Sequence, residues 1–269
     1  MPFSWNSLPR PIVALAPMSG VTDAAFRRII KKIAPDVLLY TEFVSTNAMT
    51  HGSEKTRSML EFDSLIERPI VVQVFGADPS ILVEACKEIE ALGVDGIDIN
   101  MGCPAAKIVS SCYGSALIQK PELAQELVHS VVRAVKIPVS VKTRLGWDTD
   151  ATLIPFVCGL IDAGAQAIAI HGRTYKDKFT GSARWEAIYD LKRSFPSVPI
   201  LGNGDICSGA DALVKIGNLD GLLIGRGCIG NPWMFQEVID ALHAPTPNPS
   251  PGPCGAAGGG GQKGGRQIA

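Results

Sequence analysis

Apolar and polar stretches alternate along this chain at a regular interval. Short apolar runs are followed by longer stretches in which apolar residues recur at helical spacing, a pattern typical of β-α units around a parallel sheet. The eight runs that we expect to form strands are Ile12–Ala16, Val37–Thr41, Ile70–Phe75, Gly96–Asn100, Val139–Thr143, Ala167–His171, Ile200–Asn203 and Gly221–Gly225. Helical patterns lie between them, at Asp23–Ile33, Pro79–Leu92, Glu122–Val135, Thr152–Ala163, Trp185–Arg193 and Cys207–Ile216.

The number of repeats favours one fold class. Eight β-α units within roughly 240 residues match the usual size of a (β/α)8 TIM barrel. A doubly wound open sheet fits less well, because no predicted strand is followed by a Gly-x-Gly-x-x-Gly turn. We therefore expect residues 1–243 to form one α/β barrel. From Pro245 to Pro253 every second residue is proline, and a glycine run follows, so we expect residues 244–269 to form a disordered tail.

Composition narrows the function classes further. The formal net charge of -1 over 269 residues gives no overall attraction to nucleic acid, so any polyanionic partner must bind a local basic patch. No apolar segment has the length of a membrane helix, and residues 1–10 lack the pattern of a secretion signal. The seven cysteines are scattered, without C-x-x-C spacing, and predict neither a disulfide framework nor a metal site. We expect a cytoplasmic protein that acts as a monomer.

One cysteine stands in a different context from the others. The apolar run at residues 96–99 leads into Gly-Cys-Pro at 102–104, which indicates a buried strand that delivers the Cys103 thiol into a loop. The carboxyl ends of parallel strands are where α/β folds place their chemistry. A lone cysteine is more often inert packing. Here Asp98 and Asn100 precede it and Lys107 follows, so the thiol is a candidate acid or nucleophile, and the residues alone leave both roles open.

Polar residues follow all eight predicted strands. In a barrel these strand ends face one cavity, and burying so many polar groups without partners would cost several kcal/mol in total. We therefore interpret them as one functional site. Its members are Pro17, Met18 and Ser19, then Glu42, Gln73, Asn100 with Cys103, Lys142 with Arg144, His171 with Arg173, Asn203 with Gly204 and Asp205, and Gly225 with Arg226.

The last two loops of this site indicate its ligand. They follow strands seven and eight, where barrels commonly bind phosphate through glycine amides and a helix N-terminus. Arg226 adds a charged donor for phosphate oxygens, which predicts a phosphorylated cofactor or substrate. Lys142 and His171 would then be able to stabilise negative charge on a reduced flavin, with Gln73 at an amide-like edge. A Schiff-base lysine of an aldolase is the alternative role for Lys142.

Five motifs, taken together and in order, resemble those of the FMN-dependent tRNA-dihydrouridine synthases, nearest to the bacterial B-type branch. The resemblance runs from Leu8 to about Leu242. In that family a C-terminal helical domain follows the barrel and helps to grip tRNA, whereas here the proline- and glycine-rich tail takes its place. The motifs are residues 16–23 with Phe26 and Arg27, residues 98–104, residues 142–144, residues 171–174, and residues 203–206 with Gly225 and Arg226.

The resemblance implies an enzyme that uses FMN and NADPH to reduce specific uridines of tRNA to 5,6-dihydrouridine. Cys103 would be the general acid that protonates C5 of the base. A stacked uridine would have to be flipped into the cavity. The candidate tRNA contacts are Asn100, Lys107, Arg144 and Arg173, and the residues that would hold FMN are Pro17, Met18, Ser19, Gln73, Lys142, His171, Asn203, Gly204, Asp205, Gly225 and Arg226.

Two other classes of function stay open at this point. An FMN barrel oxidoreductase that acts on a free small molecule would share the phosphate loops. A truncated flavoprotein or RNA-binding remnant would keep the cofactor or weak RNA binding without turnover. Arg144, Arg173, Lys176 and Lys178 form a local basic cluster, which indicates either an RNA contact or an ordinary solvated loop.

Overall fold

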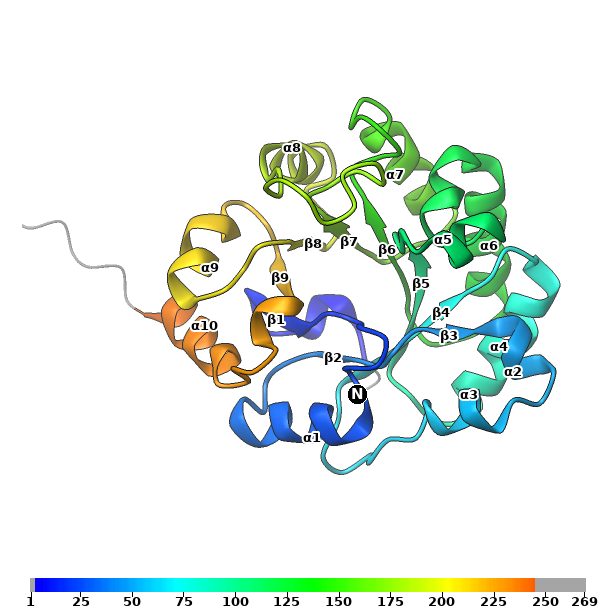
Figure 1. Ribbon diagram of the computed structural model, residues 1–269, viewed down its shortest axis with the longest axis horizontal. Helices are drawn as coiled ribbons and strands as arrows, with labels where there is room; N and C mark the ends of the chain where they lie inside the picture. Colours follow the sequence, from blue (N-terminus) through cyan, green and yellow to red (C-terminus); the bar gives the residue numbers. More distant parts are fainter. Residues whose placement is uncertain (1–2, 245–269) are drawn as a thin grey trace, which may run out of the picture.

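The computed structural model describes residues 3–244, in which parallel strands form a ring and the helices lie outside it (Figure 1). The predicted tail beyond Ala244 lies outside the described residues. The ring confirms the prediction of a TIM barrel. Its hydrogen-bonded order is β1 (Ile12–Leu15), β9 (Gly221–Ile224), β8 (Ile200–Asn203), β7 (Ala167–His171), β6 (Val139–Arg144), β5 (Gly96–Met101), β4 (Ile70–Phe75) and β2 (Leu39–Tyr40), and β3 (Val44–Ser45) also pairs with β4.

The second strand position differs from its prediction. The expected single strand Val37–Thr41 is shorter, and pairing with β4 resumes only at β3, after the segment Thr41–Phe43. The Thr41 amide still donates to the Val71 carbonyl oxygen of β4 at 3.1 Å. The Glu42 carboxylate accepts from the Gly20 amide, so the side chain of Glu42 contacts the loop after β1. The Leu38 backbone completes the ring by two hydrogen bonds to β1, of 2.9 and 3.0 Å.

The six predicted helices are present, each within two residues of its expected bounds. Side-chain caps explain two of the starts, since the Asp23 carboxylate accepts from the Phe26 amide and the Asp78 carboxylate accepts from the Ile81 amide. These helices are α1 (Ala24–Ile33), α4 (Pro79–Ala91), α6 (Pro121–Ala134), α7 (Leu153–Asp162), α8 (Glu186–Ser194) and α9 (Gly209–Ile216). The remaining elements are α2 (Thr46–Thr50), α3 (Glu54–Ser58), α5 (Ala106–Ser110), α10 (Met234–His243), and the 3-10 helices η1 (Trp5–Ser7), η2 (Gly114–Gln119) and η3 (Arg226–Cys228).

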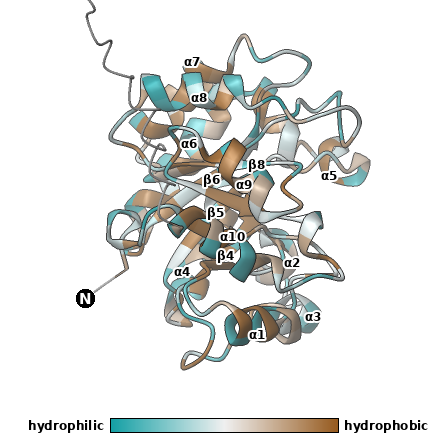
Figure 2. Cartoon of the chain, turned by 90° about the vertical axis from the view of Figure 1, so that its left-hand side faces the viewer, coloured by the Kyte–Doolittle hydropathy of each residue, from teal (hydrophilic) through white to brown (hydrophobic). Residues whose placement is uncertain are grey.

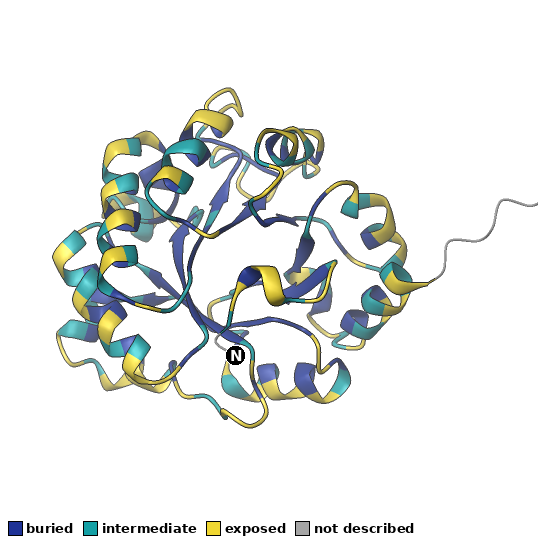
Figure 3. Ribbon diagram, turned by 180° about the vertical axis from the view of Figure 1, so that it is seen from behind, coloured by how far each residue is buried: buried dark blue, intermediate teal, exposed yellow. Residues whose placement is uncertain are grey.

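The strands bury both of their faces, as Figure 3 shows by the dark blue ring, and Figure 2 shows their apolar colour. On β7, Ile168 and Ile170 belong to the large cluster that packs under the helices, whereas Ala167 and Ala169 belong to a smaller cluster inside the barrel. Side chains of one strand alternate between its faces. The next residue on the inner face of β7 is His171, so the alternation that builds the core also turns the polar strand ends inward.

Within residues 3–244, no helix combines the length and the apolar character that crossing a bilayer would need.

Candidate active site

A cavity of about 820 Å³ lies at the carboxyl ends of the strands. Every residue that the sequence predicts to bind the cofactor lines it. Of the other predicted site residues, Asn100, Cys103 and Arg144 also line it, whereas Glu42, Lys107 and Arg173 do not. The lining residues predicted from the sequence are Pro17, Met18, Ser19, Gln73, Asn100, Cys103, Lys142, Arg144, His171, Asn203, Gly204, Asp205, Gly225 and Arg226.

A chain of buried hydrogen bonds runs from the barrel interior to the Cys103 loop. Gln73 Nε2 donates to Asp98 Oδ2 at 2.7 Å, and Asn100 Nδ2 donates to Gln73 Oε1 at 2.8 Å. Asn100 Oδ1 then accepts from the backbone amides of Gly102 at 3.1 Å and Cys103 at 2.9 Å. The Cys103 loop is therefore held from beneath by side chains of β4 and β5.

The Cys103 loop is also held from its other side. The Ser115 amide donates to the Cys103 carbonyl oxygen at 3.1 Å. Gly114 has a φ of 59°, and a Cβ there would lie 2.8 Å from that same oxygen. Only glycine permits this approach at low cost. The thiol is half-buried and faces the cavity, so a group bound there is able to reach it.

Lys142 places an ammonium group in the cavity wall. Its Nζ donates to Asn203 Oδ1 at 3.1 Å, and Asn203 Nδ2 donates to the Leu223 carbonyl at 2.9 Å, so both side chains are fixed. Burial, and then the charge of Arg144, lower the pKa of Lys142 to about 8. The lysine keeps its proton at neutral pH and supplies a positive charge that few water molecules screen.

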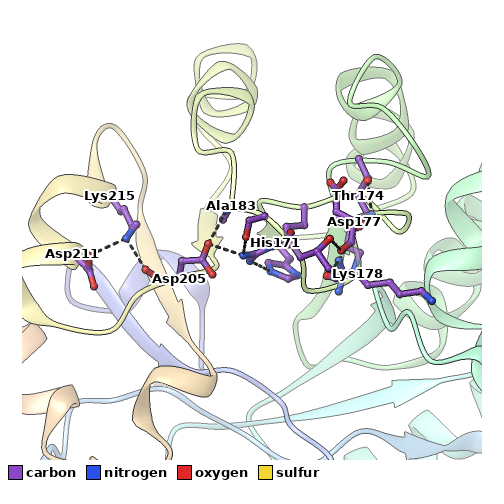
Figure 4. A network of polar contacts seen from close by, with 12 residues as sticks. His171, Thr174, Asp177, Lys178, Ala183, Asp205, Asp211 and Lys215 are labelled. Carbon is purple, nitrogen blue, oxygen red and sulfur yellow. Dashed lines mark hydrogen bonds and ion pairs between the residues drawn. The ribbon is translucent and has the colours of Figure 1, made fainter.

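His171 belongs to a network that supports the last cavity loops (Figure 4). Arg173 Nη1 lies 3.3 Å from His171 Nε2, and Arg173 Nη2 donates to Asp205 Oδ2 at 2.8 Å. An arginine only donates, so His171 Nε2 must accept, which places the imidazole proton on Nδ1. Burial, and then the charges of Lys142 and Arg144, lower the pKa of His171 far below its usual value. The imidazole is therefore neutral.

Asp205 completes this network in the loop that follows β8. Its Oδ2 also accepts from the Ala183 amide at 2.7 Å, and Lys215 Nζ donates to its carbonyl oxygen at 2.6 Å. Asp205 has a φ of 52°, an uncommon backbone conformation for a residue other than glycine. Contacts from two neighbouring helix regions therefore fix this loop where it meets the cavity.

The four residues of the predicted basic cluster do not form one exposed patch. Arg173 is 3% exposed, and its other donors bind the carbonyl oxygens of Thr180 and Gly181. Lys176 forms an ion pair with Asp148 at 3.1 Å. Lys178, which lines the cavity, and Lys107, exposed on α5, form no ion pair with any residue in the range 3–244.

Arg144 is buried, but only part of its donor capacity is used. Its Nε donates to the Gly102 carbonyl at 2.7 Å, and its Nη1 donates to the carbonyls of Thr174 and Lys178 at 2.9 and 2.8 Å. No bond of Nη2 is found within the described part of the chain. Arg144 therefore braces two cavity loops and still has donors for a bound group.

Phe179 is a site residue that the sequence reasoning missed. The residue is 54% exposed and lines the cavity, and two guanidinium groups lie over its ring, that of Arg226 at 4.9 Å and that of Arg144 at 5.4 Å from the centroid. Aromatic faces attract cations at this distance. The available signal was an aromatic residue directly after the charged run 176–178, in the loop that follows β7.

The comparisons with known proteins identify the family of the chain. The family model described as "Dihydrouridine synthase (Dus)" matches residues 14–254. The chain belongs to the dihydrouridine synthase family. This confirms the resemblance that its motifs indicate.

Three relatives illustrate the extent of the match. A protein of Synechocystis named "Probable tRNA-dihydrouridine synthase 1" is 40% identical over 229 residues, which are 84% of this chain and 64% of the relative. The "tRNA-dihydrouridine synthase B" of Pseudomonas aeruginosa is 41% identical over 240 residues, 88% of this chain and 71% of the relative. A "Probable tRNA-dihydrouridine synthase" of Rickettsia bellii is 36% identical over 89% of this chain and 74% of its own length. The chain thus spans about two thirds of the length of such relatives.

Proposed function

We propose that this protein reduces uridines of tRNA to 5,6-dihydrouridine, with FMN as its cofactor and NADPH as the electron donor, as a cytoplasmic monomer. The observation that carries this proposal is that Cys103, Lys142 and Arg226 line the same cavity. A proton donor, a buried cation and a phosphate-binding cation are the three groups that flavin-dependent reduction of a pyrimidine needs. Family membership supports the same conclusion.

The residues present fit FMN. The side chain of Arg226 has no hydrogen bond or ion pair within the described residues and is free to bind a phosphate. At Gly225 a Cβ would lie 3.7 Å from Ala16 and 3.8 Å from Met18, both cavity residues, so glycine keeps the backbone open there. We infer that Gly204, Gly225 and Arg226 hold the phosphate, and that Gln73, Lys142 and His171 hold the ring.

The chemistry divides between the cofactor and the chain. FMN held by these residues would supply the hydride for reduction of the uracil ring at C6. C5 would then need a proton, and the Cys103 thiol is the proton donor that we infer, because Cys103 lines the cavity. The thiol regains its proton from water. Asn100 holds the Cys103 amide, so the thiol is positioned before the base arrives.

We infer the tRNA contacts from the side-chain donors that have no partner within the described residues and from the residues that line the cavity. Asn100 and Arg144 line the cavity, and we infer that they contact the flipped base or its sugar. Lys107 is exposed on α5, next to the Cys103 loop, and suits a backbone phosphate. Arg173 is nearly saturated by internal partners. We therefore infer that Arg173 supports His171 and Asp205 rather than RNA.

The test begins with the visible absorption spectrum of the purified protein. Released FMN is expected, followed by dihydrouridine formation on an unmodified tRNA transcript with NADPH. Cys103→Ala is expected to abolish turnover and to spare flavin binding, whereas Cys158→Ala, on α7 outside the cavity, is expected to retain turnover. Reduction of free pyrimidines but not of tRNA would favour the small-molecule oxidoreductase instead. A colourless protein that takes up no added FMN would overturn the cofactor assignment.

A further inference from the structure

Asp98 is a buried carboxylate that does not line the cavity. Its side chain is fully buried on β5, with Ser140 Oγ donating to Oδ1 at 2.6 Å and Gln73 Nε2 donating to Oδ2 at 2.7 Å. No hydrogen bond of Asp98 leads towards solvent within residues 3–244. Burying a carboxylate is costly, so its presence beneath the site calls for a physical account.

The ionised carboxylate of Asp98 fixes the orientation of these side-chain amides at one end, and the backbone amides of Gly102 and Cys103, which only donate, require the same orientation at the other end. An ionised carboxylate only accepts hydrogen bonds, so Gln73 must turn its amide nitrogen towards Asp98. The Gln73 carbonyl oxygen then faces Asn100, which in turn must present its own nitrogen. That leaves Asn100 Oδ1 as the acceptor for the backbone amides of Gly102 and Cys103.

We propose that Asp98 is a positioning residue, whose negative charge orients the amides of Gln73 and Asn100 and thereby holds the backbone of Cys103 at the cavity. The catalytic meaning of this role rests on the proposed function, because that function makes Cys103 the proton donor. The positioning itself is a property of the folded chain. It is therefore testable without substrate or cofactor.

The surroundings of Asp98 make its charge sensitive to pH. The groups that face it are Gln73 from β4, Ser140 and Lys142 from β6, and Tyr40 from β2. Burial raises the pKa of Asp98 to about 6, although the two hydrogen bonds and Lys142 oppose the rise. A protonated Asp98 is able to donate to a glutamine oxygen. The orientation of the two amides would then no longer be imposed from this end.

Amide hydrogen exchange of Gly102 and Cys103 reports this role directly. In Asp98→Asn, an isosteric change that removes the charge, either end of the new amide is able to face Gln73. We expect the protection of the Gly102 and Cys103 amides to fall by about tenfold, the factor that corresponds to one hydrogen bond in a local opening equilibrium. Exchange is measured by mass spectrometry on the whole protein, without added flavin or RNA.

Ile97→Val is the matched control. Ile97 is also fully buried, is adjacent to Asp98 on β5, and packs into the cluster under the helices instead. This change also weakens the core, and we expect it to leave protection at the Cys103 loop within about twofold of wild type, a difference well below one hydrogen bond. Equal losses in both variants would show that Asp98 acts only through general stability, and unchanged protection in Asp98→Asn would also overturn the proposal.

A second measurement uses the unaltered chain, in case Asp98→Asn does not fold. After correction for intrinsic exchange rates, wild-type protection of the Cys103 amide is expected to fall as the pH drops below about 6. Flat protection between pH 7 and 5 would contradict the proposal. If the positioning holds but the chain reduces no uridine, only the proposed function fails. If tRNA is reduced while exchange is unaffected by Asp98, only this inference fails.

Discussion

Lys142 shows at the scale of one residue how a buried charge in the cavity wall bears on stability. Its pKa is about 8 in the folded chain, mainly through burial, against 10.5 for an ordinary lysine. The folded state therefore holds the proton more weakly than the unfolded state. The resulting penalty is present below pH 8 and is relieved as the pH rises through 10.5. Its size is up to about 3 kcal/mol.

Lys142→Met should remove this pH dependence. Going from pH 7 to pH 10, we expect the unfolding free energy of the wild type to rise relative to that of Lys142→Met, by about 1 to 3 kcal/mol. Urea denaturation of both proteins at both pH values measures the difference, and other titrating groups cancel from it. A difference that stays constant between the two pH values would show that Lys142 bears no such penalty.

His171 offers a second prediction at this scale. Because Arg173 donates to Nε2, we expect the neutral form with its proton on Nδ1, and no titration between pH 5 and 8. Nitrogen-15 NMR distinguishes the two tautomers, and the chain has only four histidines to assign. In Arg173→Met we expect the Nε2-protonated form to appear and the pKa of His171 to rise. An Nε2 proton in the wild type would contradict the assignment.

At the scale of the element, the sequence predicts what repeats and misses what does not. The strand runs and the six long helices carry enough alternating residues for a period to show. The helices α2, α3 and α5 have five residues each, too few for such a period. Length does not explain α10, which has ten residues and is not among the predicted helices. Where the second strand divides, the side chain of Glu42 contacts Gly20, which lies 22 residues away in the sequence. Local pattern does not contain that information.

The same distinction holds for the site. Parallel strands in a ring bring their carboxyl ends together, so the cavity lining followed from the fold class. The guanidinium contacts of Phe179 and the support of Cys103 by Asp98 depend on side-chain rotamers across several elements. Arg173 shows most clearly what the sequence does not predict. Its position at a strand end predicts a cavity residue, whereas its donors bind the Thr180 carbonyl and the Asp205 carboxylate.

The junction between the Cys103 loop and η2 yields a prediction at the element scale. In Gly114→Ala a Cβ would lie 2.8 Å from the Cys103 carbonyl oxygen, so one of the two loops must shift. We expect a loss of about 2 to 4 kcal/mol in unfolding free energy, from the left-handed φ and the clash together. We expect the rate of Cys103 alkylation, monitored by peptide mass spectrometry, to change.

Gly52→Ala is the control for this change. Gly52 has a φ of 78°, and no atom lies within 4 Å of the position that a Cβ would take, so it bears the backbone cost without the clash. We expect about 1 kcal/mol of destabilisation and an unchanged rate of Cys103 alkylation. Equal effects of the two variants on stability and on alkylation would mean that the contact with Cys103 is unimportant.

At the scale of the whole molecule, a buried ion pair joins the helix that precedes the short strand β2 to the segment that precedes β4. Arg27 on α1, which follows β1, donates through Nε to Glu67, which precedes β4, at 2.6 Å, and both side chains are at most 1% exposed. Arg27 also donates to the carbonyl of Thr22 at 2.9 Å, and the Thr22 hydroxyl bonds the backbone of Met18 in the cavity wall. The ring and the site therefore share this anchor.

Glu67→Gln should accordingly be costly, because it leaves the Arg27 guanidinium buried without a counter-charge. We expect a loss of about 3 to 5 kcal/mol in unfolding free energy, measured by urea denaturation at neutral pH. Arg193→Ala removes one partner of an exposed pair with Asp190 and should cost less than about 1 kcal/mol. The double change Arg27→Met and Glu67→Leu should recover much of the loss, since no buried charge remains. A single Glu67→Gln change no costlier than Arg193→Ala would mean that the ring is held at this point by backbone pairing and apolar packing alone.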